Sequence, residues 1–209
     1  MLRVGLTGGI ATGKTTVASM LRERDVPVLD ADPLGHALLE PGQAAYNEVV
    51  ADFGKEVLDS YKNVDRANLG RIIFADAQKR ARLNQILHPR ILDVVQKWFA
   101  ALDVPKGDPD GPAFAVVEAA LIVEAGYNKN LDQVVVCWCR PEQQLERLVQ
   151  RGLTEQQAQQ RIAAQMPLDE KRKLANVEID CSGSIENTQS QVDRAIEKLK
   201  LAAAGRNIP

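Results

Sequence analysis

The chain has 209 residues, enough for one substantial hydrophobic core with attached pieces and few for two independent domains of ordinary size. Its 45% hydrophobic and 26% charged residues exclude a disordered or fibrous class, and its formal net charge of −2 gives no basic footprint for nucleic acid. No apolar run approaches the roughly 18 residues of a membrane span, and the first residues do not resemble a secretion signal. We therefore expect a soluble, cytoplasmic protein without a membrane or nucleic acid partner.

The three cysteines do not form the framework of a disulfide-rich protein. Cys137 and Cys139 lie two positions apart in an apolar run, which favours buried thiols in a strand. A zinc site needs further Cys or His at ligand spacing, and His36 and His88 are isolated in the sequence, so we do not expect one.

Short β-rich runs alternate with longer helical patterns along the chain. The first pair is a strand at 2–6 followed by a helix at 14–24, and the last helix is expected at 185–204. Further strands are predicted at 26–29, 114–117, 133–139 and 177–181. Strands separated by helical crossovers favour a parallel, doubly wound α/β sheet, which binds its ligands at the carboxyl ends of the strands.

Residues between the second and third strands show helical patterns at 42–53, 66–74 and 77–102, which predict an inserted helical subdomain. The segment 105–112 is rich in Pro, Gly and Asp and is expected to be a loop. The Gln-rich segment 154–165 is typical of a surface helix and hinge.

Residues 8–15 match the pattern G-x-x-x-x-G-K-T between a predicted strand and a predicted helix. Gly8 and Gly13 allow a backbone that turns N–H groups toward an anion, Lys14 adds a charge near the outer phosphates, and Thr15 offers a hydroxyl to Mg²⁺. An ordinary Gly-rich turn is the alternative, but four fixed positions rarely coincide by chance. The predicted residues for binding the phosphates of ATP are Gly9, Ile10, Ala11, Thr12, Gly13, Lys14, Thr15 and Thr16.

Asp30 and Asp32 come at the end of the second strand, where their side chains point to opposite sides if the strand persists. A carboxylate there is suited to orient an acceptor hydroxyl and take its proton. Alternatively, Asp32 is a helix N-cap, because Pro33 and a short helical pattern follow it. Glu118, at the end of the third strand, either helps to hold Mg²⁺ through water or is a solvated strand end.

Arg147 and Arg151 lie four positions apart on the helix after the fourth strand and project from one face. Two guanidiniums placed in this way are suited to clamp a transferring phosphoryl group. The alternative is a solvated face on which they pair with Glu142 and Glu146.

His88 occurs in the sequence Leu-His-Pro, late in a long helical pattern where proline is expected to kink the helix. Such a histidine is more often packed and hydrogen-bonded than an acid or base.

The order of these motifs resembles that of the dephospho-CoA kinase family, P-loop kinases related in fold to the nucleoside monophosphate kinases. Residues 5–15 resemble the P-loop of that family, the sequence Val-Leu-Asp-Ala-Asp at 28–32 resembles its D-A-D motif, and 87–89 match its L-H-P. The P-loop is generic, whereas the D-A-D, L-H-P and Q-M-P motifs in this order are specific to the family.

The resemblance continues through the second half of the chain. Leu-Ile-Val-Glu at 121–124 resembles the end of the P-L-L-x-E motif, Arg147 and Arg151 match the lid arginines, and Gln-Met-Pro at 165–167 with Lys171 matches Q-M-P and its following lysine.

Two positions depart from the pattern of the family. Ala120 stands where the Pro of P-L-L-x-E is usual, which puts the local backbone in question. Asn176 stands where an Ala-Asp pair is usual, which predicts loss of a structural hydrogen bond.

The resemblance implies a three-layer α/β/α P-loop fold with a five-stranded parallel sheet, an inserted helical substrate-binding subdomain and a short helical lid. These parts form a single kinase domain. Its core is expected at about 1–32, 112–140 and 166–209, the acceptor-binding insertion at about 33–111, and the lid at about 141–165.

The activity implied is transfer of the ATP γ-phosphoryl to the ribose 3′-hydroxyl of dephospho-CoA, giving coenzyme A and ADP, with Mg²⁺ as cofactor and a monomer favoured. Asp32, Lys14, Arg147 and Arg151 would be catalytic, Thr15 would bind the metal, and the acceptor would be bound by Asp32, His88, Leu121 and Glu124. A nucleoside monophosphate kinase differs only in its acceptor. A nucleotide-dependent switch would keep the P-loop but would not need Asp32 or the lid arginines.

Overall fold

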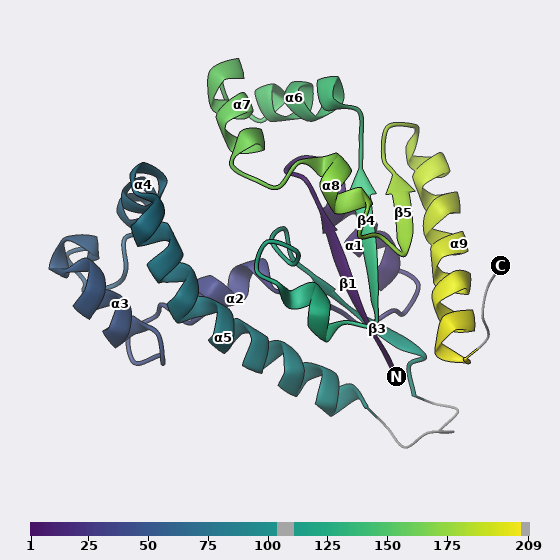
Figure 1. The fold of residues 1–209 in the computed structure, drawn as a ribbon, viewed down its shortest axis with the longest axis horizontal. Coiled ribbons are helices and arrows are strands. Elements are labelled where there is room, and N and C mark those ends of the chain that lie inside the picture. Colours follow the sequence, from purple (N-terminus) through teal and green to yellow (C-terminus); the bar gives the residue numbers. More distant parts are fainter. Residues whose placement is uncertain (104–110, 206–209) are drawn as a thin grey trace. The chain divides into compact units, whose positions relative to one another are not determined.

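The computed structural model of the chain describes residues 1–103 and 111–205. The chain divides into two compact units, one formed by Met1–Leu29 and Phe99–Pro209 and the other by Asp30–Trp98 (Figure 1). Most of the loop predicted at 105–112 lies outside the described residues.

A five-stranded sheet with the order β2-β3-β1-β4-β5 organises the first unit. Its central strand, β1 (Leu2–Gly8), pairs in parallel with β3 (Phe114–Glu118) on one side and with β4 (Gln133–Trp138) on the other. The outer strands are β2 (Val28–Asp30) and β5 (Val177–Asp180), the latter also parallel to its neighbour. All five predicted strands are present, and the predicted parallel α/β class is confirmed.

Helices connect these strands, with the phosphate-loop motif between β1 and α1 (Lys14–Arg22). After β4 come α6 (Pro141–Gln150) and α7 (Glu155–Ala163), followed by the short α8 (Leu168–Arg172). Thr154 and Gln157 begin α7 with a capping box, which satisfies two backbone N–H groups that the helix leaves without partners. The last helix, α9 (Ile185–Ala203), is capped by the Ser184 side chain.

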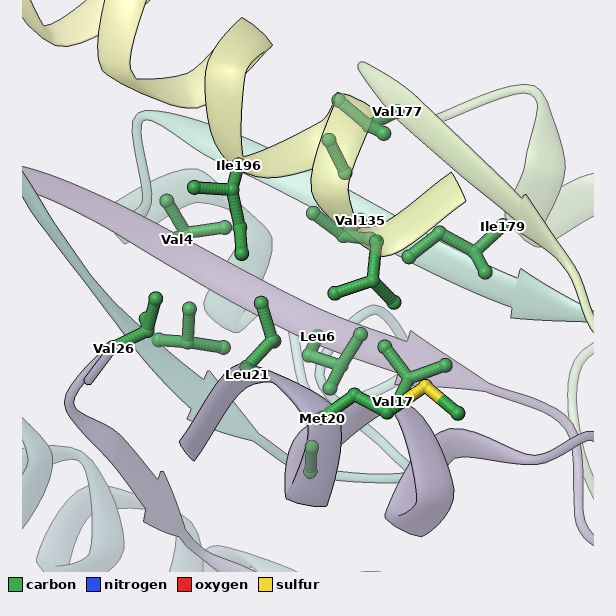
Figure 2. Packing of buried hydrophobic residues seen from close by; sticks show 14 of the residues in the cluster. Val4, Leu6, Val17, Met20, Leu21, Val26, Val135, Val177, Ile179 and Ile196 are labelled. Carbon is green, nitrogen blue, oxygen red and sulfur yellow. The ribbon is translucent and has the colours of Figure 1, made fainter. Parts of the chain in front are cut away.

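Alternation along β1 separates the two faces of the sheet. Val4 and Leu6 are fully buried in a cluster with residues of α1 and α9, including Val17, Leu21 and Ile196 (Figure 2). On the opposite face a Cβ at Gly5 would lie 2.6 Å from Leu131 and 3.2 Å from Ile122, so the chain after β3 packs directly on the strand backbone. The sheet is therefore covered on both faces, as the three-layer prediction requires.

The unit Asp30–Trp98 is helical, with α2 (Asp32–Ala37), α3 (Tyr46–Phe53), α4 (Arg66–Ala75) and most of α5 (Ala77–Leu102). A short 3₁₀ helix at Lys55–Val57 joins α3 to the following turn. The core of this unit is built around the buried side chains of Leu39, Ala45, Val49, Phe53, Val57, Leu69, Leu83 and Ile86.

Ion pairs join α5 to α3 within this helical unit. The Arg82 guanidinium contacts Glu48 and Asp52, and Arg90 also contacts Glu48. All of these side chains are at least partly exposed, so the pairs contribute little free energy beside the apolar core. Among residues 1–103 and 111–205, none of the helices combines the length and the apolar character needed to cross a bilayer.

The structure corrects the local interpretation of the acidic pair after the second strand. The strand ends at Asp30 and α2 begins at Asp32, so the alternation expected of a continuing strand does not apply. The N-cap of α2 is Ala31, and the interpretation of Asp32 as the N-cap is wrong. Asp30 instead accepts a hydrogen bond from the backbone N–H of Asp32 at 3.0 Å.

Truncating the central strand tests the core. Leu6 is fully buried between β1 and the helices, and Leu6→Ala should lower the free energy of unfolding by about 2–5 kcal/mol, because methyl groups are lost and a cavity remains. Leu201→Ala, at a position 39% exposed on α9, is the matched control. Urea unfolding followed by circular dichroism measures both, and equal losses would contradict this assignment of the core.

Candidate active site

The loop between β1 and α1 has a backbone that few residues adopt. Ala11 and Gly13 have φ angles of 60° and 107°, in the left-handed region. A Cβ at Gly8 would lie 2.5 Å from the Cys137 carbonyl oxygen, which is too close for any side chain. Gly13 immediately precedes the first turn of α1, where backbone N–H groups have no helical partner. The loop thus places an anion-binding helix N-terminus at the edge of the sheet.

Side chains from outside the loop form hydrogen bonds with the backbone of Ile10 and Ala11. The Gln144 side-chain amide donates to the Ile10 carbonyl oxygen at 2.6 Å, and the Ile10 N–H donates to the Gln165 side-chain oxygen at 2.8 Å. The Arg147 guanidinium donates to the carbonyl oxygens of Ala11 at 3.2 Å and Cys181 at 2.7 Å. The loop is therefore held by three side chains that lie outside it.

A buried carboxylate lies beside the lysine of the motif. Lys14 Nζ is 2.8 Å from Glu118 Oε1, and Arg22 Nη2 is 3.5 Å from Glu118 Oε2. Glu118 is only 1% exposed, so the prediction of a solvated strand end is wrong. Its Oε2 atom has no hydrogen-bond partner within the described part of the chain. A buried carboxylate oxygen of this kind, close to the hydroxyl-bearing start of α1, suits the oxygen-rich environment that Mg²⁺ prefers.

A cavity of about 240 Å³ opens beside the loop. It is lined by loop and helix residues together with both predicted lid arginines and the segment after β5, namely Ala11, Gly13, Thr16, Arg147, Arg151, Cys181, Gly183, Ile185 and Thr188. The arrangement brings Arg147 and Arg151 to the same cavity as the phosphate loop, although Arg151 lies just past the last residue of α6. Two arginines that line a cavity beside the N-terminus of α1 favour an anionic ligand.

All three cysteines are free, buried thiols, as predicted for Cys137 and Cys139. Cys181, which the sequence did not single out, lies under the loop, because a Cβ at Gly13 would be 3.1 Å from its sulfur. A hydrogen bond from Cys137 lowers the pKa of the Cys181 thiol, while that bond and burial raise the pKa of Cys137.

Lys171 is a fully buried cation next to the base of the loop. Its ammonium donates to the carbonyl oxygens of Gly8 at 3.3 Å and Ala120 at 2.8 Å, and lies 2.9 Å from Glu124 Oε1. Glu124 also accepts the backbone N–H of Met166 at 3.1 Å. The lysine therefore links the loop, the turn after β3 and the segment that follows α7.

The other predicted acceptor residues lie in different parts of the chain. Leu121 is 41% exposed after β3, and Glu124 is engaged by Lys171. Asp32 and His88 belong to the helical unit, at the start of α2 and within α5. Burial lowers the pKa of His88, which favours its neutral imidazole.

Both departures from the family pattern are accommodated. The Asn176 side-chain oxygen accepts the Val134 N–H at 2.8 Å, and the Asn176 N–H donates to the Val134 carbonyl, so this position carries hydrogen bonds to β4. At Ala120 the backbone carbonyl accepts from Thr7 and Lys171, contacts that need no proline.

Comparison with known proteins places this geometry in a family. The family model described as dephospho-CoA kinase matches residues 2–187. The chain belongs to the dephospho-CoA kinase family. A dephospho-CoA kinase of Shouchella clausii is 42% identical over 94% of this chain and 98% of its own length, and one of Carboxydothermus hydrogenoformans is 41% identical over 94% of both chains.

A solved structure agrees with this family assignment. The dephospho-CoA kinase of Campylobacter jejuni superposes with a TM-score of 0.69 at 25% identity, covering 96% of this chain and 98% of that one. The end-to-end coverage matches the order of motifs read from the sequence, and the resemblance to dephospho-CoA kinases is confirmed.

Removing the buried lysine of this kinase-family site should destabilise the fold. Lys171→Met removes the ammonium that contacts Glu124 and two carbonyl groups, and we expect a loss of about 3 kcal/mol, the low end for a broken buried pair because Glu124 remains 22% exposed. Lys173→Met, two positions on and 67% exposed, is the matched control. If chemical unfolding finds the two variants equally stable, Lys171 does not have this structural role.

Proposed function

We propose that the chain transfers the γ-phosphoryl group of ATP to the ribose 3′-hydroxyl of dephospho-CoA, the final step of coenzyme A biosynthesis. The observation that carries the proposal is a phosphate loop held by side-chain hydrogen bonds to Ile10, within a chain that matches the dephospho-CoA kinase family from residue 2 to residue 187. Such preorganisation is what phosphoryl transfer requires, since the protein acts chiefly by positioning and charge.

The phosphates would be bound by residues 9–16 of the loop and the first turn of α1. Lys14 would exchange its contact with Glu118 for the outer phosphates, supplying positive charge where negative charge develops. Arg151, which lines the same cavity from the end of α6, would also supply positive charge to the phosphates. Arg147 would hold the carbonyl group of Ala11 in place.

Mg²⁺ would be held with ATP by Thr15 and, through water, by Glu118. The Thr15 side chain is exposed at the start of α1, and Glu118 has an oxygen without a hydrogen-bond partner in the described chain. The bound metal neutralises charge on the phosphate oxygens during transfer.

On the acceptor side, Asp32 would orient the ribose hydroxyl and take its proton, with His88, Leu121 and Glu124 contributing to the acceptor site. We propose that residues 33–111 bind the acceptor and that residues 141–165 form the lid that excludes water. We further propose that the protein works as a cytoplasmic monomer on small molecules, and its net charge of −2 agrees with the absence of a nucleic acid partner.

Formation of ADP that depends on dephospho-CoA tests the proposal directly. The purified protein should phosphorylate dephospho-CoA with Mg·ATP, whereas nucleoside monophosphates should be poor acceptors. Lys14→Ala should abolish transfer while circular dichroism shows an intact fold. Preference for a nucleoside monophosphate would identify a different small-molecule kinase, and ATP turnover unaffected by every acceptor would support a nucleotide-dependent switch.

Replacing the proposed base should affect turnover rather than nucleotide binding. Asp32→Asn keeps the size of the side chain but removes the base, so kcat should fall by about 10²–10⁴ with little change in KM for ATP. Asp30→Asn is the matched control, because its remaining side-chain oxygen still accepts the N–H of residue 32. A near-normal rate for Asp32→Asn would remove this carboxylate from the mechanism.

The melting temperatures of their alanine variants should distinguish the roles of Arg147 and Arg151. Arg147→Ala loses two hydrogen bonds to backbone carbonyl groups and should lower both kcat and the melting temperature without nucleotide, whereas Arg151→Ala should lower kcat by about 10²-fold with an unchanged melting temperature. Lysine should rescue Arg147 poorly, because it lacks the planar fork. Unchanged kcat in both alanine variants would favour the solvated-face interpretation.

A further inference from the structure

The two ends of the proposed lid, residues 141–165, each send a glutamine to one residue of the phosphate loop. Gln144 lies in the first turn of α6, and Gln165 lies two positions past the end of α7. Gln144 donates to the Ile10 carbonyl oxygen at 2.6 Å, and Gln165 accepts from the Ile10 N–H at 2.8 Å. Both backbone groups of Ile10 are thus bound by side chains that are far away in sequence and lie on either side of the lid helices.

These contacts are closely fitted to the loop. Gln144 is only 5% exposed, although its side chain is polar. A Cβ at Gly9 would come within 2.7 Å of the Gln144 amide nitrogen, so the absence of a side chain at Gly9 makes room for this contact. Removing the partner of a buried amide leaves a polar group without a hydrogen bond, which destabilises the folded structure.

Ile10 precedes the most unusual residue of the loop. Ala11 has a φ of 60°, a conformation that costs an L-residue about 1–2 kcal/mol and persists where the surroundings hold it. Fixing the peptide groups of Ile10 restricts the neighbouring dihedral angles of Ala11, whose own carbonyl is held by Arg147. The direction of the following N–H groups depends on this geometry.

We propose that Gln144 and Gln165 are positioning residues that set the Ile10–Ala11 backbone for phosphate binding and couple it to both ends of the lid. Movement of either end changes a hydrogen bond to the loop, so nucleotide binding and the arrangement of the lid are linked in both directions. The proposal rests on the proposed function only in taking a nucleotide phosphate as the ligand of the loop.

The opposite polarity of the two hydrogen bonds provides a sharp test. Gln144→Glu removes the donor and places a carboxylate oxygen against the Ile10 carbonyl, whereas Gln165→Glu retains an acceptor for the Ile10 N–H. Both variants add the same charge to nearly the same volume. Gln150→Glu is the matched control for that charge, since Gln150 is exposed on α6 and its side chain donates to Glu146.

Calorimetric titration of each full-length variant with Mg·ADP gives the expected contrast. Gln144→Glu should bind about tenfold or more weakly than Gln150→Glu, the cost of a lost hydrogen bond with a buried unpaired group. Gln165→Glu should stay within about threefold of Gln150→Glu, and Gln165→Met, which has no such acceptor, should again lose about tenfold. The KM for ATP should rise in parallel while the KM for dephospho-CoA stays constant.

A role confined to the fold gives a different result. In that case melting temperatures without nucleotide fall in Gln144→Glu and Gln165→Met, but the Kd for Mg·ADP remains within twofold of Gln150→Glu, and the proposal is overturned. If Gln144→Glu does not fold, the comparison of Gln165→Met with Gln165→Glu decides alone. Wild-type protein that binds Mg·ADP but does not phosphorylate dephospho-CoA would contradict the proposed function and leave this comparison valid, and absence of Mg·ADP binding would overturn both.

Discussion

The site depends on holding a short stretch of unfavourable backbone at the end of β1. Ala11 and Gly13 take left-handed conformations, and the N–H groups that follow have no partner within α1. A loop with these properties would relax if only its own residues stabilised it. It is instead held by hydrogen bonds with Gln144, Gln165 and Arg147, which offset the conformational entropy lost when the loop is ordered.

Two ion pairs that include buried side chains contact the same loop. Lys171 is completely buried, and it is tolerated there because two carbonyl oxygens and Glu124 surround its ammonium. Lys14 and Glu118, whose side chains are 11% and 1% exposed, form a second ion pair at 2.8 Å. The first pair joins Lys171 to Glu124 and to two backbone carbonyl groups. The second includes the lysine of the phosphate loop, which phosphate binding would draw away from the carboxylate.

The parallel sheet brings these groups to one edge. Gly8 and Glu118 are the last residues of β1 and β3, and α6 follows the end of the adjacent β4. The phosphate loop, the carboxylate and the start of α6 therefore lie at one edge of the sheet although they are far apart in the sequence. The same alternation that directs Leu6 into the core directs Gly5 to the opposite face, where the chain after β3 covers the strand. The pairing register of β1 therefore fixes both which side chains enter the core and which residues lie at the functional edge of the sheet.

Much of this molecule could be predicted from local patterns. The G-x-x-x-x-G-K-T motif, all five strands and the order of family motifs were readable because each depends on residue types at short, fixed spacings. The end of β2 could not be predicted in this way. Whether Asp32 extends the strand or begins a helix depends on Pro33 and on the packing around α2. Nor could spacing distinguish a solvated Arg147 from one that binds the loop, because its acceptors, Ala11 and Cys181, are over thirty positions away.

Contacts of this long range decided the remaining features of the site. A polar residue such as Gln144 has the same sequence signature on a solvated helix face as in a buried contact, and only the folded chain brings Ile10 to it. Glu118 likewise was read equally well as a solvated strand end until the sheet buried it beside Lys14. The sequence by itself determined the chemistry available and the class of fold, because these follow from composition and periodicity. Tertiary structure alone decided which polar groups meet, because hydrogen bonds between distant segments leave no periodic trace in the sequence.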